Sequence, residues 1–388
     1  MKIPFKYILR NFYSRKLTTT ATVLGMTLVV VVFTVAFMMG MGIRKTLSVT
    51  GSENNALVVR KSSQGEISSI INREVADIIS SLPQVAKSSE GKPLISTEPV
   101  VIFIQPKKGG GVSNLTVRGV TPVAFQIRDN IKLVEGKTFG FGSRELIVGK
   151  SISKRFNGVA IGDKVKLAGD MWTIVGVFDA GGSGFDSEVW GDSEQLLSAF
   201  QRTSYSTITF RLSDPKQIEQ LKLQFDADKR LKQFTPEIER TYFSKQSNQT
   251  SGFIMGLGVF ITLFIMVGAI IGAMITMFTA VANRTTEIGT LRALGFTRGS
   301  ILISFLFESL LLSVVGCVLG LLISSTMSSM EVSTINFQSF SEIAFNFTLN
   351  IYIVLGAFAF SIFMGLVGGF LPSWRASRLK IIEALRAA

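Results

Sequence analysis

Four stretches of the 388-residue chain are almost free of charged residues, namely 17–43, 246–283, 299–330 and 343–374. Each is longer than the roughly 20 residues that a helix needs to cross the hydrocarbon core of a bilayer. The pattern predicts four transmembrane helices, one before and three after a long polar segment at 44–245. The helix at 246–283 is longer than a bilayer requires, so we expect it to tilt strongly or to project as a stalk. The stalk is favoured because the soluble segment attaches there.

The segment 44–245 has the pattern of a folded soluble domain. Runs such as VVIFI at 100–104 and MWTIVGVF at 171–178 favour strands, and Gly- and Asp-rich turns separate them. Apolar residues recur at helical spacing from Ile67 to Leu82, just before Pro83. The predicted class is therefore a membrane protein with four transmembrane α-helices and a large α+β domain between the first and the second.

Residues 1–16 precede the first apolar run and carry five basic residues and no acidic one. Phe5, Ile8 and Phe12 share a helical face, which favours an amphipathic helix at the membrane surface over a plain basic flank. The apolar run that follows is far longer than the core of a signal peptide, and no small-residue cleavage site follows promptly. The first span is therefore predicted to be a retained anchor.

The formal net charge of +13 is unevenly distributed. Basic residues dominate the N-terminal tail, the segment 284–298 and the tail 375–388, whereas the loop 331–342 carries two acidic residues and no basic one. The positive-inside rule then places both termini and 284–298 in the cytoplasm, and 44–245 and 331–342 outside. No basic run is dense enough to indicate a nucleic-acid surface.

The chain contains no histidine and one cysteine, Cys317. An intrachain disulfide is therefore impossible, and a Ser-His-Asp triad, a Cys-His dyad and a His-ligated metal site are excluded. The glycine-rich stretches 107–111 and 181–184 are predicted to be flexible turns. Neither is a phosphate loop, because no Lys-Ser or Lys-Thr follows at Walker spacing. We predict no catalytic residue, metal site or cofactor in this chain.

The short polar segment 284–298 lies between the second and third apolar runs. Ile288, Leu291 and Leu294 form a narrow apolar stripe at i, i+3 and i+6, and Arg284 can pair with Glu287. Gly295 stands where a helix C-terminus favours a positive φ. The pattern predicts a short amphipathic helix. A docking helix for a cytoplasmic partner is favoured over a plain loop, because a loop needs no apolar stripe.

The apolar runs contain few polar or small residues of note. Glu308 is the one charged residue of the third run. Carboxylates in membranes usually face the protein interior, so we expect an interhelical partner, with Arg298 or a basic terminus as candidates, rather than snorkelling to the interface. Three Gly-x-x-x-Gly pairs predict close helix contacts, within or between subunits. They are Gly268 and Gly272, Gly316 and Gly320, and Gly365 and Gly369.

Several motifs resemble, in order, those of the MacB/FtsX/LolC-type (type VII) ABC transporter permeases. They are LRNFYSRKLTTTATVLGM at 9–26, ELIVGKSISKRF at 145–156, WTIVGVF at 172–178, RTTEIGTLRALGFTRGSI at 284–301 and PSWRASRLKIIEALR at 372–386. Their order, with one span before and three after the outer segment, is more specific than any single motif. The resemblance implies a MacB-type periplasmic core domain at 44–245.

The resemblance also implies a role for the segment 284–298. It would be a coupling helix that docks on an ATPase, and the positions that match the motif are Arg284, Glu287, Ile288, Leu291, Arg292, Leu294 and Gly295. Unlike MacB, this sequence contains no Walker A motif. ATP and Mg²⁺ are therefore expected on a separate cytoplasmic ABC ATPase dimer, and the chain itself is expected to be a non-catalytic subunit.

The function that the resemblance implies is that of a permease subunit working by mechanotransmission in a bacterial inner membrane. The expected cargo is a lipoprotein, a lipid or an amphipathic peptide. Expected partners are a second permease copy or a homologue, membrane lipids, and a periplasmic adaptor or lipoprotein. The alternative is an FtsX-like transducer that activates an outer partner such as a cell-wall hydrolase, which the long outer segment disfavours. A scaffold without an energy source is disfavoured by the amphipathic segment.

Overall fold

The computed structural model describes residues 16–386, which form two compact units. Of the described residues, the helical unit contains 16–41, 252–330 and 347–386. The outer unit contains Gly42–Ser251 and Glu331–Asn346. The amphipathic helix predicted at 1–16 lies outside the described residues, apart from Lys16.

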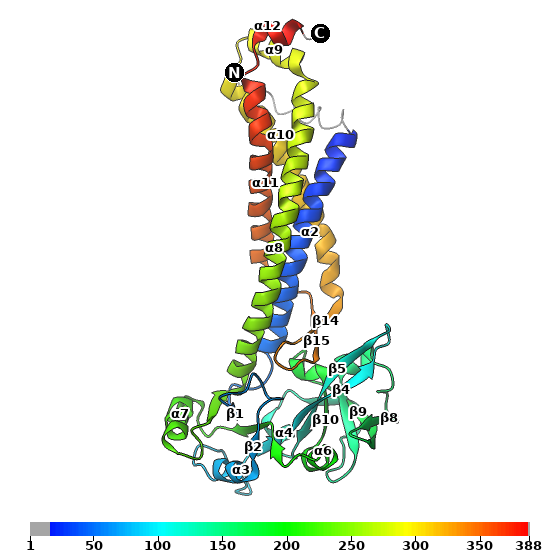
Figure 1. Ribbon diagram of the computed structural model, residues 1–388, viewed down its shortest axis with the longest axis vertical. Coiled ribbons are helices and arrows are strands. Elements are labelled where there is room, and N and C mark those ends of the chain that lie inside the picture. The colour runs from blue at the N-terminus through cyan, green and yellow to red at the C-terminus, as the bar shows by residue number, and fades with distance from the viewer. Residues whose placement is uncertain (1–15, 387–388) are drawn as a thin grey trace. The chain divides into compact units, whose positions relative to one another are not determined.

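The helical unit is built on four long helices (Figure 1). They are α2 (Lys16–Ser48), α8 (Glu239–Ala282), α10 (Arg298–Thr326) and α11 (Ile351–Ser377). Each is long and apolar enough to cross a membrane, which confirms the four predicted spans and their arrangement of one and three. α8 has 44 residues, or about 66 Å at 1.5 Å per residue, and its first residues belong to the outer unit. Whether it tilts or forms a stalk stays a prediction.

The fourth helix begins later than the predicted span 343–374. α11 starts at Ile351, where the side chain of Asn350 accepts a hydrogen bond from the backbone N–H of Ile353. Residues Glu342–Asn346 form a strand, β15, instead of the first turns of a helix. The apolar residues before Asn350 therefore extended the predicted span by mistake, since apolar content alone does not separate a buried strand from a helix.

Among the described residues, two short α-helices and the 3-10 turn η3 (Met327–Ser329) complete the helical unit. α9 (Thr285–Ala293) and α12 (Ile381–Arg386) pack against each other at the same end of the long helices (Figure 1). Gly295 has a φ of +93°, and the side chain of Thr297 then caps α10 by accepting a hydrogen bond from Ser300 N–H. The segment predicted to be a short helix with a glycine turn therefore has that local structure.

The first sheet of the outer unit has four antiparallel strands. Its order is β13 (Phe234–Ile238), β1 (Asn55–Arg60), β12 (Thr207–Arg211) and β3 (Ile95–Glu98). The helices α3 (Arg73–Ser80) and α7 (Ile218–Ala227) contribute Val75, Ile79, Leu221 and Phe225 to its apolar core. The predicted helix from Ile67 to Leu82 is thus shorter than expected, because Ile71–Asn72 instead form β2, which pairs with β11 (Ser204–Tyr205).

The second sheet is mixed and has seven strands. Its order is β4 (Val100–Pro106), β5 (Val112–Val120), β10 (Glu188–Asp192), β7 (Glu145–Gly149), β9 (Asp170–Asp179) and β6 (Lys132–Gly136), with β8 (Lys164–Leu167) also paired to β9. The short helices α5 (Lys150–Arg155) and α6 (Ser193–Ala199) and the 3-10 turn η1 (Gly184–Ser187) pack against it, whereas α4 (Ala124–Ile127) contacts β12 of the first sheet. Trp172 and Trp190 are fully buried in its cores. The outer unit therefore has the predicted α+β composition.

The predicted loop 331–342 is part of a β-hairpin that belongs to the outer unit. β14 (Glu331–Ile335) pairs with β15 (Glu342–Asn346). The hairpin is attached by hydrogen bonds between Thr116 Oγ1 and Ser341 Oγ (2.7 Å) and from Ala344 N–H to Ser187 Oγ (2.9 Å). Buried Glu342 also forms an ion pair with Arg155. The sequence predicted a loop instead of this hairpin because the hairpin's partners lie more than 150 residues earlier in the chain.

Candidate functional site

The apolar stripe of α9 is divided between the protein interior and the surface. Ile288 is 1% exposed and packs with Val281, Ile301 and Phe305 in a cluster that draws on α2, α8, α10 and α11. Leu294 is 67% exposed. Leu291 and Arg292 are half-buried, whereas Glu287 and Gly295 are exposed. Ile288 therefore anchors α9 to the helical unit, and Leu294 is the apolar side chain of the stripe that a partner can reach.

Arg284 connects α9 to the third long helix. Its Nε donates to Glu287 Oε2 at 3.0 Å, the pair predicted from the i, i+3 spacing, and its Nη1 donates to Glu308 Oε2 at 3.2 Å. The guanidinium also lies 5.1 Å from the ring centroid of Phe305. Within the described residues, the ion pair of Glu308 is with Arg284 rather than with Arg298. The pairing with a basic terminus that the sequence suggested stays a prediction, because residues 1–15 lie outside the described residues. The turn at the start of α9 brings Arg284 back to α10, which spacing along the chain does not reveal.

Two of the three Gly-x-x-x-Gly pairs make contacts within this chain. Gly316 and Gly320 lie against Met26 and Val30 of α2, and Gly365 and Gly369 lie against Ser313 and Ser309 of α10. Ser309 Oγ donates to the carbonyl oxygen of Gly365 at 2.7 Å, and Ser361 Oγ donates to that of Ser313 at 2.6 Å. Backbones this close leave no room for a Cβ at these glycines, as expected for small residues at membrane-helix contacts.

The third pair is open. Gly268 and Gly272 have no neighbouring atom within 4 Å of the position that a Cβ would take, and neither has Gly25 on α2. Together with Leu28 and Ile265 they line a groove of about 390 Å³ between α2 and α8. Among the described residues, nothing therefore packs closely against Gly25, Gly268 and Gly272.

A buried network of charged side chains lies in the outer unit, and the sequence analysis did not single it out. Arg118 on β5 donates to Glu66, Glu98 and Glu188 at 2.6–3.0 Å. Arg128 donates to Glu98 at 2.7 Å and to Glu239, the first residue of α8, at 2.8 Å. Glu98 lies on the first sheet, and Arg118 and Glu188 lie on the second. The network therefore joins both sheets to the start of α8.

The pKa values in this network reflect burial opposed by ion pairing. Burial alone would raise the pKa of Glu98, but Arg128 and Arg118 hold it below its ordinary value. Burial raises the pKa of Glu66 above its ordinary value, and Arg118 only partly opposes this. Burial alone would lower the pKa of Arg128, but the carboxylates of Glu239 and Glu98 more than offset this effect and hold the pKa above its ordinary value. Both arginines therefore stay charged, and Glu66 is protonated more easily than Glu98.

Aromatic rings surround the two guanidiniums. The Arg128 guanidinium carbon lies 5.0 Å from the ring centroid of Phe185 and 5.5 Å from that of Trp190. Trp190 Nε1–H donates to Glu188 at 2.8 Å, and Asn55 Nδ2–H donates to Glu239 at 2.8 Å. Such close, dry partners strengthen each ion pair and fix its geometry. The sequence feature that could have indicated this network is Arg118, a charged residue inside the apolar run that forms β5.

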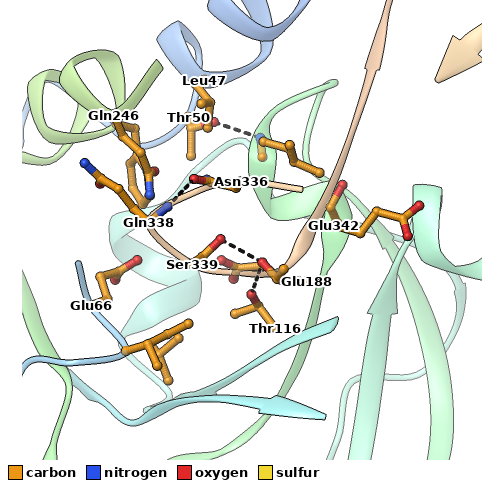
Figure 2. Close-up of a pocket in the computed structure, with 17 residues that line it drawn as sticks. Leu47, Thr50, Glu66, Thr116, Glu188, Gln246, Asn336, Gln338, Ser339 and Glu342 are labelled. Carbon is orange, nitrogen blue, oxygen red and sulfur yellow. Dashed lines mark hydrogen bonds between the residues drawn. The ribbon is translucent and has the colours of Figure 1, made fainter. Parts of the chain in front are cut away.

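A small polar pocket adjoins the network (Figure 2). Glu66, Glu188 and Thr116 line one side, and residues of the β14–β15 hairpin, including Asn336, Gln338 and Ser339, line the other. Its volume of about 40 Å³ admits only a few water molecules. Among the described residues, no group of three or more His, Cys, Asp or Glu side chains is arranged to hold a metal ion. The polar side chains that line the pocket hold the hairpin by hydrogen bonds, such as that between Thr116 and Ser341.

Two family models match this chain, one over its N-terminal half and one over its C-terminal part. Residues 19–227 match the model of the MacB-like periplasmic core domain, and residues 259–381 match that of the FtsX-like permease C-terminal domain. The chain therefore belongs to the family of MacB/FtsX-type ABC transporter permeases, as its motifs indicated. With its four membrane-length helices, it is a multi-pass membrane protein.

The individual relatives have low sequence identity to this chain. The chain is 27% identical to the uncharacterised ABC transporter permease YknZ of Bacillus subtilis, over 71% of this chain and 70% of that protein. It is 24% identical to the pyoverdine export ATP-binding/permease protein PvdT of Pseudomonas entomophila, over 97% of this chain and 57% of that protein. The solved extracellular domain of YknZ is similar at 16% identity with a TM-score of 0.36, over 47% of this chain and all of that one.

Proposed function

We propose that this chain is the permease subunit of an ABC complex and that α9 couples it to a separate ATPase, which binds ATP and Mg²⁺. The observation that carries the proposal is the position of α9. Ile288 and Arg284 fasten it to the long helices, while Leu294 faces outward. A short helix held in this way moves with the helical unit and still presents a surface to a partner. The chain would itself perform no catalysis.

The coupling would be mechanical. Closure of the ATPase would push on α9, and the Ile288 cluster and the Arg284–Glu308 pair would pass the displacement to the long helices. α8 continues without a break from Glu239 to Ala282, so it is suited to act as a lever. A continuous channel through the membrane is not required. The cargo class would be a lipoprotein, a lipid or an amphipathic peptide.

Substitution Leu294→Asp is expected to abolish co-purification of the ATPase and its permease-dependent ATP turnover, because it places a charge on the exposed apolar contact. Leu223→Asp on α7 is the matched control, since Leu223 is a 71% exposed leucine of the outer unit. Both variants should be expressed and should elute like the unaltered protein. Retention of both the complex and its ATP turnover in Leu294→Asp would refute the coupling role of α9.

We further propose that a second permease copy, or a homologue, covers the groove of Gly25, Gly268 and Gly272. Small residues without contacts of their own permit close approach of another helix. Gly272→Phe should therefore shift the purified protein from dimer to monomer in light-scattering measurements. Gly252→Phe is the control, because Gly252 lies on the same helix with open space around it but outside the groove. An unchanged dimer in Gly272→Phe would show that the groove is not the interface.

Localisation and cargo follow from the same proposal. The family resemblance favours a bacterial inner membrane, and the distribution of basic residues favours an orientation with both termini in the cytoplasm and the outer unit on the other side. In liposomes that contain the whole complex, stimulation of ATP turnover by a lipoprotein or amphipathic peptide would support transport. Activation of a cell-wall hydrolase without release of any cargo would instead support the FtsX-like transducer.

A further inference from the structure

β4 is an edge strand of the seven-stranded sheet, so half of its backbone N–H and C=O groups point toward β5 and the other half point away from the sheet. Pro99 C=O accepts from Gly119 N–H, and Lys107 N–H donates to Gly111 C=O, so the odd-numbered residues bond toward β5. In an antiparallel pair this direction alternates from residue to residue. The even-numbered residues of β4 therefore point their N–H and C=O groups away from the sheet.

The two ends of this outward edge are already occupied. Val100 N–H donates to Ser206 Oγ at 2.9 Å, and Val100 C=O accepts from Arg202 at 3.1 Å. At the other end Pro106 C=O accepts from Asn157 N–H at 2.9 Å. Between them, the outward peptide groups of Ile102 and Ile104 have no described hydrogen-bond partner. The sheet therefore offers a short open edge of fixed length, which an incoming strand can extend.

Exposed apolar side chains lie on one face of the same edge. Ile104 pairs in register with Asn114, and Pro106 with Val112, so these side chains share a face of the sheet. Ile104 is 65% exposed and Val112 is 66% exposed. Phe340 of the hairpin is 57% exposed, and its carbonyl oxygen accepts from Asn114 Nδ2–H at 2.9 Å. Phe340 is held at a φ of +49°, a strained conformation for a residue other than glycine.

Two cations flank the open edge without a carboxylate partner in the described part of the chain. Arg202 donates only to Val100 C=O and Ser206 Oγ, and burial lowers its pKa because no anion opposes it. Lys108 donates to Ser153 C=O at 2.8 Å. The neighbouring Lys107 is by contrast paired with Glu342. A ligand with acidic groups at both ends would complement Arg202 and Lys108.

We propose that the open edge of β4 binds an extended segment of a partner protein by strand addition. The free peptide groups of Ile102 and Ile104 select a polypeptide backbone, since only a strand presents matching donors and acceptors at this spacing. Ile104, Val112 and Phe340 select alternating apolar side chains, and Arg202 and Lys108 select acidic residues at the ends of the segment. The site lies wholly in the outer unit and does not depend on the ATPase.

The test uses the full-length protein in lipid nanodiscs and a fluorescent peptide of alternating valine and threonine with an aspartate at each end. Binding is followed by anisotropy, and the protected amides are located by hydrogen exchange. The control peptide has the same side chains with every valine and threonine amide N-methylated. We expect it to bind at least about tenfold more weakly, and we expect protection by the unmodified peptide within 100–106.

Variants of the protein provide the second arm. Ile104→Pro removes one outward N–H and is tolerated at a sheet edge, whereas Ile104→Thr keeps that N–H and strand propensity. Ile104→Pro should weaken binding about tenfold relative to Ile104→Thr, and Lys108→Glu should weaken it further at low salt. Equal binding of the N-methylated peptide, protection outside 100–106, or no binding at about 1 mM peptide would each overturn the proposal.

Discussion

Arg128→Ala is expected to lower the free energy of unfolding of the outer unit by about 3–5 kcal/mol. Arg128 is fully buried and donates to both Glu98 and Glu239. Its removal leaves Glu98 with Arg118 as its remaining cationic partner, and it leaves Glu239 without one among the described residues. An uncompensated buried carboxylate is far more costly than the loss of a surface pair, so the effect should clearly exceed that of removing a surface arginine.

The measurement is denaturant unfolding followed by tryptophan fluorescence in a Trp374→Phe background. The remaining tryptophans, Trp172 and Trp190, are buried in the outer unit and therefore report on it. Arg144→Ala is the matched control, because Arg144 pairs with Asp170 at the surface and should contribute less than about 1 kcal/mol. If Arg128→Ala unfolds at the same denaturant concentration as Arg144→Ala, the network does not stabilise the domain.

The two carboxylates with opposite pKa shifts provide a sharper version of this test. The pKa of Glu98 is lowered on folding, so its stabilising contribution is present above the ordinary glutamate pKa and is lost as pH falls through the folded value. The pKa of Glu66 is raised, so its contribution is present below the ordinary value and is lost as pH rises through the folded one. Near neutral pH, Glu98→Gln should therefore destabilise the outer unit strongly, and Glu66→Gln should be well tolerated.

Arg284→Glu is expected to reduce ATP turnover of the assembled complex about tenfold or more, a barrier change of at least about 1.4 kcal/mol. The substitution places a third carboxylate beside Glu287 and Glu308, so α9 should be pushed away from α10. The double variant Arg284→Glu with Glu308→Arg restores opposite charges across this contact. It should recover most of the lost turnover, which distinguishes a pairwise contact from general damage.

Arg298→Glu serves as the control for the charge change, since Arg298 is an exposed residue at the start of α10. An acidic residue near a helix N-terminus is favourable, so this variant should keep its turnover. Loss of activity in Arg298→Glu equal to that in Arg284→Glu, or no recovery in the double variant, would contradict the role of the Arg284–Glu308 pair.

Local features of this protein were predictable from the sequence. The four spans follow from apolar runs that exceed the thickness of a bilayer, which needs no knowledge of their neighbours. The turn after α9 follows from Gly295, whose positive φ is a property of one residue. Runs such as 171–178 became part of β9 because branched and aromatic residues between turns favour strands.

The sequence did not reveal which side chains of these elements are buried against neighbours and which remain exposed. The apolar stripe of α9 was visible, but its division into buried Ile288 and exposed Leu294 depends on where the long helices pass. The three glycine pairs look alike in the sequence, yet Gly268 and Gly272 alone among them remain open. Which face of an element is covered is decided by its neighbours, and periodicity describes only the element itself.

The sequence by itself therefore determined the membrane helices, the α+β outer unit and, through its motifs, the permease family. Only the tertiary structure placed the 331–346 hairpin on the outer unit and assembled the arginine network. Arg128 and Glu239 are 111 residues apart, and Thr116 and Ser341 are 225 residues apart. Pairing of charges and hydroxyls over such separations depends on the meeting of distant strands, whereas helix length and strand propensity are properties of neighbouring residues.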